Sequence, residues 1–289
     1  MNGIINVLKP PGMTSHDVVA VVRRSIKIKK VGHTGTLDPG AAGVLPICIG
    51  KGTKIVDYIV NQSKEYICEL TFGNESDTCD KYGNFIYEES KDYSHITLES
   101  FNKALEAFKG EITQTPPAYS AIKINGQRAY DLARKGIEFE IPKRNVTIYN
   151  IEVLEFNLPK VMLKINCSKG TYIRSICREL GYALNCPSYM RFLMRTKTGP
   201  FKIEDSVILD NINLDNIDSI LLPINLGIEM EEIFLDSKHE KKLLNGNYIK
   251  DTKLPKNNYT KIKVFIKPNK FIGIGHIYNN TLKIDKLMV

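Results

Sequence analysis

The sequence predicts an α+β protein, in which a mostly antiparallel mixed sheet is followed by a small β-rich domain at the C-terminus. Strand-like and helix-like segments are interleaved without the regular strand–helix–strand repeat that produces a parallel sheet. Near residue 225 the pattern changes to short strand-like segments. A length of 289 residues is enough for one large domain and one small one. We therefore expect two domains, at residues 1–228 and 229–289.

The first part of the chain predicts a strand, a helix and a glycine-rich loop, in that order. Residues 3–8 are mostly apolar and run into a proline- and glycine-containing turn, which predicts an opening strand. Thr14 or Ser15 can cap a helix whose apolar residues recur at helical spacing. A glycine-rich loop follows at residues 32–43, and an apolar stretch comes directly after it. Residues 64–72 alternate with period two, which predicts a strand.

The middle of the chain predicts two further helices, a strand and a hairpin. Residues 97–109 have one apolar side and end at Gly110, which is typical of a helix and its stop. Asn125-Gly126 is typical of a hairpin turn. Residues 161–167 alternate as a strand, and the apolar positions after Gly170 recur at helical spacing.

The C-terminal segment holds most of the net positive charge. Ser237 and Glu240 match a capping box, which predicts a short lysine-rich helix that ends at Gly246. Residues 230–289 contain 12 lysines against six acidic residues, so they supply +6 of the net charge of +8. Such an excess indicates an anionic partner. Three strand-like segments complete this part, at residues 261–267, 271–277 and 282–287.

The composition is that of an ordinary globular protein, with 43% hydrophobic and 25% charged residues. No apolar run approaches membrane-spanning length, and the first residues lack a signal-peptide pattern, so we expect a cytoplasmic protein without membrane contact. The six cysteines form no C-x-x-C pair and the five histidines are scattered. The spacing therefore predicts no metal site.

A glycine-rich segment around Asp38 carries the strongest chemical signal. Residues 32–46 contain four glycines, two prolines and a single carboxylate, Asp38. Pro39 restricts the preceding residue to extended backbone, and the glycines allow the chain to turn closely around a ligand. Spacing alone favours a structural turn at Asp-Pro-Gly over a catalytic group.

The same segment resembles the catalytic motif of the TruB family of tRNA pseudouridine-55 synthases. The resemblance covers about residues 3 to 201, with its motifs in the order that the family has. It rests on these stretches: Leu8-Lys9-Pro10-Pro11-Gly12, Gly32-His33-Thr34-Gly35-Thr36-Leu37-Asp38-Pro39 with Gly43-Val44-Leu45-Pro46, Asp77-Thr78-Cys79-Asp80 with Gly83, Ser168-Lys169-Gly170-Thr171-Tyr172-Ile173-Arg174, and Leu193-Met194-Arg195-Thr196.

The resemblance implies three catalytic residues. Asp38 is expected to add covalently to the nucleoside or to shield positive charge on the sugar, with attack at C1′ or at C6 both open. Arg174 corresponds to the arginine that pairs with this aspartate, although the spacing of Arg178 fits equally well. Tyr66 corresponds to an active-site tyrosine that stacks on the flipped base and is a candidate proton acceptor. The strand pattern alone makes Tyr66 a core residue.

Four further positions are implied as substrate-binding residues. Tyr172 and Leu193 correspond to residues that line the uracil pocket, although both otherwise look like core residues. His33 corresponds to a residue that stacks in the RNA where the target base has left; unaided, it would be read as a turn residue. Lys9 is expected to support the pocket or to contact a phosphate.

The family also implies the substrate and the partners. Residues 117–145 match its RNA-gripping insertion, and residues 229–289 resemble, more weakly, its PUA-like RNA-binding domain. The catalytic domain is accordingly a pseudouridine synthase domain at residues 1–228, and the partner is the T-arm of tRNA. The isomerisation is redox-neutral, so we expect no cofactor and no metal. We also expect a monomer without an obligatory protein partner.

Two alternatives remain open at this point. The chain can be the catalytic subunit of an RNA-guided pseudouridylation particle, whose enzyme shares this core. It can also be an RNA-folding module that binds without catalysis. Activity of the protein alone on a bare T-arm distinguishes the first alternative, and binding without product would indicate the second.

Overall fold

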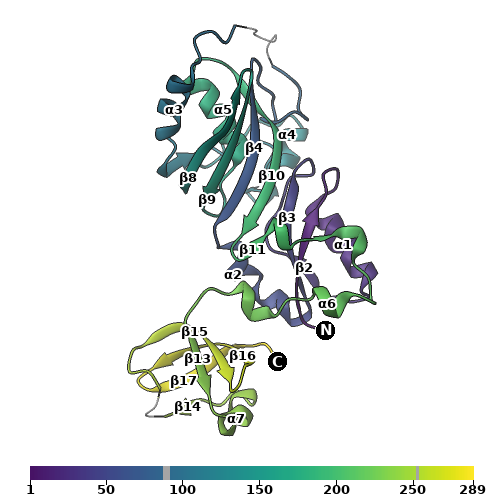
Figure 1. The fold of residues 1–289 in the computed structure, drawn as a ribbon, viewed down its shortest axis with the longest axis vertical. Helices are drawn as coiled ribbons and strands as arrows, with labels where there is room; N and C mark the ends of the chain where they lie inside the picture. The colour runs from purple at the N-terminus through teal and green to yellow at the C-terminus, as the bar shows by residue number, and fades with distance from the viewer. Residues whose placement is uncertain (87–91, 252–253) are drawn as a thin grey trace.

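A computed structural model describes residues 1–86, 92–251 and 254–289, and it confirms the α+β class (Figure 1). A ten-stranded sheet has the order β12-β1-β3-β10-β4-β9-β8-β5, with β11 beside β10 and β2 beside β3. Its pairs are antiparallel except β1 with β12 and β3 with β10, so the sheet is mixed and mostly antiparallel. The strands are β1 (Gly3–Lys9), β2 (Val31–His33), β3 (Ala42–Ile49), β4 (Lys64–Phe72), β5 (Gly110–Gln114), β8 (Arg144–Asn157), β9 (Lys160–Cys167), β10 (Ser188–Thr198), β11 (Phe201–Lys202) and β12 (Val207–Ile208).

Helices cover this sheet at both of its ends. In Figure 1, α3 and α5 lie beside β8, β9 and β4, and α1 lies beside β2 and β3. Alternate residues of β4 are buried against α3 and α5, as the period-two pattern predicts, and Phe101 of α3 and Ile176 of α5 pack in the same core. The helices of this part are α1 (Ser15–Ser25), α2 (Val56–Val60), α3 (Leu98–Glu106), α4 (Ala129–Arg134), α5 (Ile173–Ala183) and α6 (Ile217–Ile220).

The start of α1 shows how the sequence orients the loop that carries Asp38. Thr14 caps the helix in a capping box with Asp17, which decides between the two expected caps. Ser15 is buried instead, where its hydroxyl accepts a hydrogen bond from the Leu37 N–H at 2.9 Å. The helix start therefore ties down the residue that precedes Asp38.

The C-terminal part is a separate five-stranded sheet in the order β13-β15-β16-β17-β14. All three strands expected from the sequence are present, and the two short strands β13 and β14 were not predicted. The prediction of a capping box at Ser237 was wrong. Ser237 begins a 3-10 turn (Ser237–His239), and neither this turn nor the following helix has a side-chain cap. The elements are β13 (Glu232–Leu235), α7 (Glu240–Leu244), β14 (Ile249–Lys250), β15 (Tyr259–Ile266), β16 (Lys270–Tyr278) and β17 (Thr281–Leu287).

This second sheet packs against the first domain through apolar and main-chain contacts. Ile274 and Met288 are buried in one cluster with Ile4 and Ile55. The Lys54 ammonium donates to the main-chain oxygen of Leu287 at 2.7 Å. Because apolar side chains from both sheets share one core, the C-terminal part has a defined position on the first part of the chain.

Across the described ranges, no helix is both long enough and apolar enough to span a membrane.

Candidate active site

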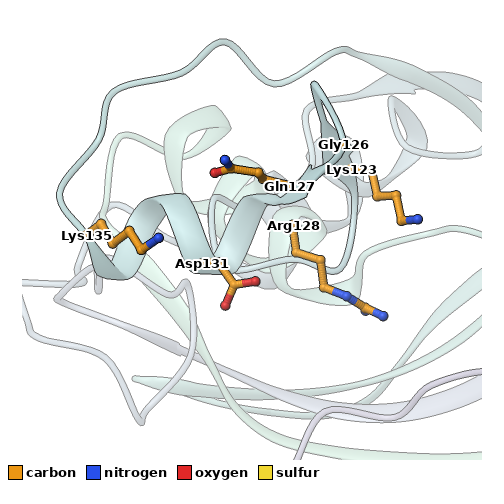
Figure 2. A pocket seen from close by; sticks show the side chains of 6 residues that line it. All are labelled: Lys123, Gly126, Gln127, Arg128, Asp131 and Lys135. Atoms are coloured by element: carbon orange, nitrogen blue, oxygen red, sulfur yellow. The ribbon is translucent and has the colours of Figure 1, made fainter.

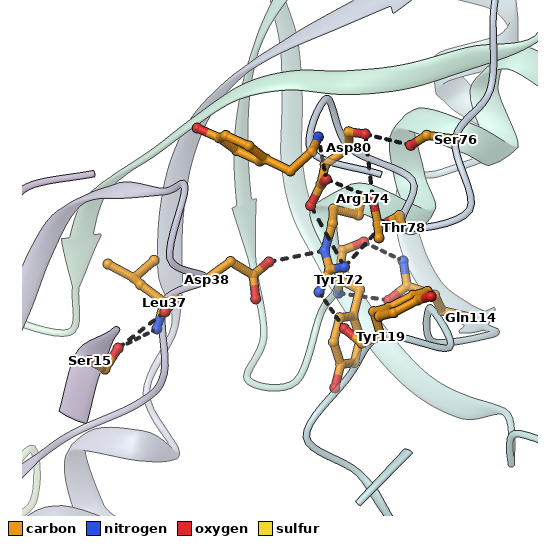
Figure 3. Close-up of polar contacts among 11 residues, drawn as sticks. Ser15, Leu37, Asp38, Ser76, Thr78, Asp80, Gln114, Tyr119, Tyr172 and Arg174 are labelled. Atoms are coloured by element: carbon orange, nitrogen blue, oxygen red, sulfur yellow. Dashed lines mark hydrogen bonds and ion pairs between the residues drawn. The ribbon is translucent and has the colours of Figure 1, made fainter. Parts of the chain in front are cut away.

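Asp38 and Arg174 form an ion pair across a pocket. The Arg174 Nε lies 3.0 Å from Asp38 Oδ2, and Figure 3 shows the two side chains pointing toward each other from separate elements. The Arg174 side chain is 5% exposed and the Asp38 side chain is 37% exposed. The cation is therefore held inside the protein, while the carboxylate stays accessible to a substrate.

The other nitrogens of Arg174 are held by the surrounding loops. Nη1 donates to the Thr78 carbonyl and Nη2 to the Tyr119 carbonyl, both at 3.0 Å. The Asp80 carboxylate lies 3.9 Å from Nη1. A planar guanidinium satisfies several acceptors at fixed angles, so Arg174 has one orientation and Asp38 meets a fixed positive charge.

Asp80 is a site residue to which the sequence analysis assigned no role. It lies in the Asp77-Thr78-Cys79-Asp80 stretch, so the signal was present in the motif. Its role was hidden because Asp80 is 94 positions before Arg174, and only the fold brings the two together.

The pocket beside Asp38 has a volume of about 90 Å³. Three residues expected from the sequence line it together with Asp38 and Arg174, namely Tyr66, Tyr172 and Leu193. Four neighbours complete the lining without having been predicted, namely Thr36, Leu37, Thr171 and Ile173. The wall is therefore aromatic and aliphatic, with one carboxylate and one guanidinium as its charges, which suits a flat heterocyclic base.

Tyr66 lies at the inner wall of this pocket and is 9% exposed. Burial raises the pKa of its phenol, and the nearby Arg195 guanidinium opposes that rise. Arg195 is itself buried, where its Nε donates to the Val44 carbonyl at 2.8 Å. The hydroxyl is therefore neutral near pH 7.

Tyr172 is positioned through its backbone. The Gln114 amide accepts from the Tyr172 N–H at 2.8 Å and donates to the Tyr172 carbonyl at 2.9 Å. The Arg144 guanidinium lies over the Tyr172 ring, 5.5 Å from its centroid. Buried Gln114 thus orients the residue directly before α5, and with it the ring that faces the pocket.

Lys9 supports the Asp38 loop from inside. Its ammonium donates to the carbonyls of Pro10 at 2.9 Å, Pro39 at 3.3 Å and Ala41 at 2.6 Å. The side chain is 0% exposed. All three N–H groups are therefore used within the protein, which fits the expected pocket-supporting role and leaves no donor for the alternative contact with a phosphate.

The buried ammonium of Lys9 predicts a rise of stability with pH. Burial lowers the pKa of Lys9 from 10.5 to about 8, and Asp38 partly opposes this. Between these two values the unfolded chain retains a proton that the folded protein has lost, so raising the pH through this window favours folding. The expected gain from Lys9 is up to about 3 kcal/mol. Urea unfolding at several pH values measures it.

Lys9→Met provides the matched comparison for that pH series. The variant should be less stable, because three carbonyls lose their donor, and its stability should rise less steeply with pH. Lys64, whose pKa burial also lowers to about 8, acts in the same direction, while the thiols of Cys48 and Cys167, whose pKa burial raises to about 12, oppose it above pH 9; both effects are common to the two proteins, so the difference in slope isolates Lys9. Identical slopes for the wild type and the variant would contradict this account of Lys9.

His33 lies outside the pocket lining, on β2 ahead of the Asp38 loop. Its Nδ1 accepts a hydrogen bond from the Gly35 N–H at 3.3 Å, and its ring meets the His16 ring edge-on at 5.8 Å. Burial lowers the pKa of His33, so the imidazole is neutral near pH 7. A neutral, partly exposed ring is suited to stacking.

Arg178, the rival of Arg174, lies on α5 but does not contact Asp38. Its Nη1 points to the Cys79 sulfur at 3.4 Å, and Nη2 lies 3.9 Å from Glu179. The arginine that faces the carboxylate is therefore Arg174.

The comparisons with known proteins agree with this geometry. Residues 23–173 match the model of the TruB family pseudouridylate synthase, N-terminal domain. The tRNA pseudouridine synthase B of Clostridium tetani is 50% identical over 291 residues, and that of Clostridium kluyveri is 46% identical over 292 residues. Both matches cover 100% of this chain and 100% of the relative.

The chain belongs to the TruB family. It is accordingly a pseudouridine synthase, an isomerase.

Solved structures place this TruB-family chain in the same fold class. A chain of the Cbf5-Nop10-Gar1 complex matches with a TM-score of 0.74 at 24% identity, covering 99% of this chain and 85% of that one. A chain of an H/ACA RNP bound to a substrate RNA containing 2′-deoxyuridine matches with a TM-score of 0.73 at 21% identity, over 99% and 85% of the two chains. At these identities the match shows the fold, including the C-terminal β domain.

Proposed function

We propose that this TruB-family enzyme converts the uridine at position 55, in the T-loop of tRNA, to pseudouridine. The observation that carries the proposal is the Asp38–Arg174 ion pair at the mouth of an aromatic-lined pocket. Full-length relatives named tRNA pseudouridine synthase B support tRNA as the substrate.

The reaction requires an accessible carboxylate and a place for a base. The N1–C1′ bond breaks, the uracil turns, and C5 bonds to C1′ while the C5 proton leaves and N1 gains a proton. An enzyme acting on these atoms has to take the nucleotide out of the stack. In our proposal, Asp38 adds to the nucleoside or shields charge on its sugar, and Arg174 holds that carboxylate. Tyr66 stacks on the everted base, and its neutral hydroxyl relays the proton, giving up its own toward N1 as it takes the one from C5, while Tyr172 and Leu193 enclose the ring.

The decisive experiment uses the purified chain alone and an unmodified tRNA transcript. Mapping by carbodiimide modification and primer extension should show one pseudouridine in the T-loop, and an isolated T-arm should also be modified. Product only on addition of a guide RNA and further proteins would favour the RNA-guided alternative. Tight binding without any product would favour the RNA-folding module. Size-exclusion chromatography of the active sample tests the expected monomer.

Tyr66→Phe separates stacking from proton transfer. We expect RNA binding to stay within about twofold of wild type, because the ring is kept. Turnover should fall by about 10²-fold or more, the usual range for loss of a general acid or base. Single-turnover kinetics with saturating RNA measures the step. Wild-type turnover of this variant would remove Tyr66 as the proton acceptor and leave only its stacking role.

We also propose that residues 117–145 grip the RNA. In this segment a hairpin of β6 (Lys123–Ile124) and β7 (Gln127–Arg128) leads into α4. A surface pocket of about 440 Å³ lies there, and Figure 2 shows the residues that line it, namely Lys123, Gly126, Gln127, Arg128, Asp131 and Lys135. Three cations against one carboxylate favour phosphate contact. Gly126, with a φ of +86°, allows the tight turn that presents them.

The PUA-like domain, which we place at residues 229–289, offers two kinds of lysine. Lys267 and Lys270 are paired with Asp236 and Glu240, at 3.1 Å and 2.6 Å. Lys241 and Lys242 are exposed on α7, and among the described residues they form no ion pair. We propose that the α7 lysines contribute to RNA binding, because paired lysines have less charge to offer a phosphate.

Replacing Lys241 and Lys242 together by alanine tests this proposal. We expect the slope of log Kd against log salt concentration to fall by up to about 2, or about 1 for each lysine that contacts a phosphate. Lys267→Ala is the matched control and should leave the slope unchanged. Equal slopes for wild type and double variant would exclude α7 from the RNA interface.

All six cysteines are buried and none forms a disulfide, which supports our placement of the enzyme in the reducing cytoplasm.

A further inference from the structure

An exposed tyrosine lies directly beside the catalytic loop. The Tyr82 residue is 63% exposed. The ring touches Gly40, two residues after Asp38, so closely that a Cβ added to Gly40 would lie 2.0 Å from Tyr82 Cε2. Gly40 thus leaves room for an aromatic ring at the rim of the active site.

The loop that carries Tyr82 is held rigidly at its tip. The Asp80 carboxylate accepts from the Tyr82 N–H at 3.0 Å and from the Thr78 hydroxyl at 2.7 Å. The Lys81 N–H donates to the Met190 carbonyl at 3.1 Å, which ties the tip to β10. The exposure of the ring is therefore a property of a structured loop.

Side chains on one face of helix α5 hold the base of the same loop. Arg174, Arg178 and Tyr182 follow each other at intervals of four residues, so they share one side of the helix. Arg174 binds the Thr78 carbonyl, Arg178 reaches the Cys79 sulfur, and the Tyr182 hydroxyl donates to Glu75 at 2.7 Å. The arginine that pairs with Asp38 thus also positions the loop that presents Tyr82.

The neighbour of Tyr82 favours an anionic partner. The Lys81 ammonium lies 5.1 Å from the centroid of the Tyr82 ring, and Lys81 is exposed. Among the described residues, Lys81 pairs with no carboxylate. An exposed ring with an unpaired lysine beside it is the combination that binds single-stranded nucleic acid, where bases stack on aromatic rings and phosphates meet cations.

We propose that Tyr82 is a positioning residue for the substrate RNA. Its ring stacks on a nucleobase of the strand next to the uridine that enters the pocket, and Lys81 meets the adjoining phosphate. The contact with Gly40 places the Tyr82 ring beside Asp38. Stacking on this ring therefore helps to align the RNA next to the target uridine with the Asp38 carboxylate. This inference rests on the proposed function for the identity of the RNA.

Tyr82→Ala and Tyr82→Phe test the stacking role with a T-arm RNA. Tyr82→Ala should raise Kd and KM about tenfold, within the range for loss of one base–aromatic stack, and Tyr82→Phe should restore both. The single-turnover rate at saturating RNA should stay within about twofold, because the ring touches no reacting atom. Tyr149→Ala is the control, since Tyr149 is 58% exposed on β8 and outside the pocket lining.

A fluorescent base provides a readout that a packing role would not change. 2-Aminopurine placed next to the target uridine should be quenched on binding to wild type and Tyr82→Phe, and less so with Tyr82→Ala. Unchanged RNA affinity of Tyr82→Ala would overturn the proposal. If the chemical step were slower at that unchanged affinity, the role of Tyr82 would be to pack against Gly40 and not to bind RNA. If Tyr82→Phe did not restore RNA binding, the stacking proposal would be wrong, and the Tyr82 hydroxyl would make the contact with RNA.

The outcome is separable from that of the proposed function. If wild type binds the RNA but forms no pseudouridine, the proposed function fails, while binding and quenching still decide the role of Tyr82. If wild type does not bind the T-arm, both proposals fail.

Discussion

Replacing Asp38 with asparagine should abolish pseudouridine formation and leave RNA binding nearly unchanged. Asparagine keeps the size of the side chain and can still accept a hydrogen bond from Arg174, but it has no negative charge and is a poor nucleophile. Both proposed roles of Asp38, addition to the nucleoside and shielding of positive charge on its sugar, depend on that negative charge. We expect a rate loss of at least about 10⁴-fold, equivalent to about 5.5 kcal/mol. Single-turnover assays with tritium release from C5 measure it.

Asp210→Asn is the matched control for loss of one charge. Asp210 is exposed on a 3-10 turn (Leu209–Asn211) of the same domain and does not line the pocket. Its variant should have wild-type turnover and affinity. If Asp38→Asn retained even about a tenth of the wild-type rate, Asp38 would not be the catalytic carboxylate.

Replacing Arg174 with lysine should have the second largest effect. Lysine keeps the positive charge but loses the planar fork that contacts Asp38, Thr78 and Tyr119 together. The carbonyls of Thr78 and Tyr119 then compete with Asp38 for one ammonium. We expect turnover to fall about 10²-fold or more, because losing hydrogen bonds that involve a charged group costs about 1.5–3 kcal/mol each. The affinity for RNA should change much less.

Arg178→Lys distinguishes the ion pair from general disturbance of α5. Arg178 lies one helical turn from Arg174 and contacts the Cys79 sulfur instead of Asp38. Its variant should lose clearly less turnover than Arg174→Lys. Wild-type kinetics of Arg174→Lys, or a larger loss in Arg178→Lys, would contradict the proposed role of Arg174 in holding Asp38 for catalysis.

Residue patterns predicted the elements with clear periodicity because those patterns record burial, whereas the long strands β8 and β10 were not predicted. The alternation in residues 64–72 and 161–167 became β4 and β9, since every second side chain faces the helices. The prediction of a capping box at Ser237 was wrong because the same residue types are compatible with the 3-10 turn that forms there. Strands β13 and β14 were missed because each is short and is stabilised by pairing with a distant strand.

Long-range contacts account for what sequence reasoning missed at the site. The sequence left open whether Lys9 supports the pocket or contacts a phosphate, and its burial under the Asp38 loop depends on how β1 pairs with β3. Gly43 is needed because a Cβ there would lie 2.2 Å from the Arg195 carbonyl on β10. Neither contact has a local signature, since the partners are far apart along the chain.

The sequence by itself determined the α+β class, the position of Asp38 in a proline- and glycine-rich loop, and the family resemblance that the comparisons confirm. These properties follow from periodicity and from motifs within a few residues of each other. Residue spacing did not distinguish Arg174, which the resemblance implied, from Arg178; the tertiary structure shows that Arg174 meets Asp38, that Asp80 joins them, and that Tyr82 stands at the rim. The reason is physical: an ion pair or a pocket depends on distances of a few ångströms between segments whose separation along the chain carries no information about those distances.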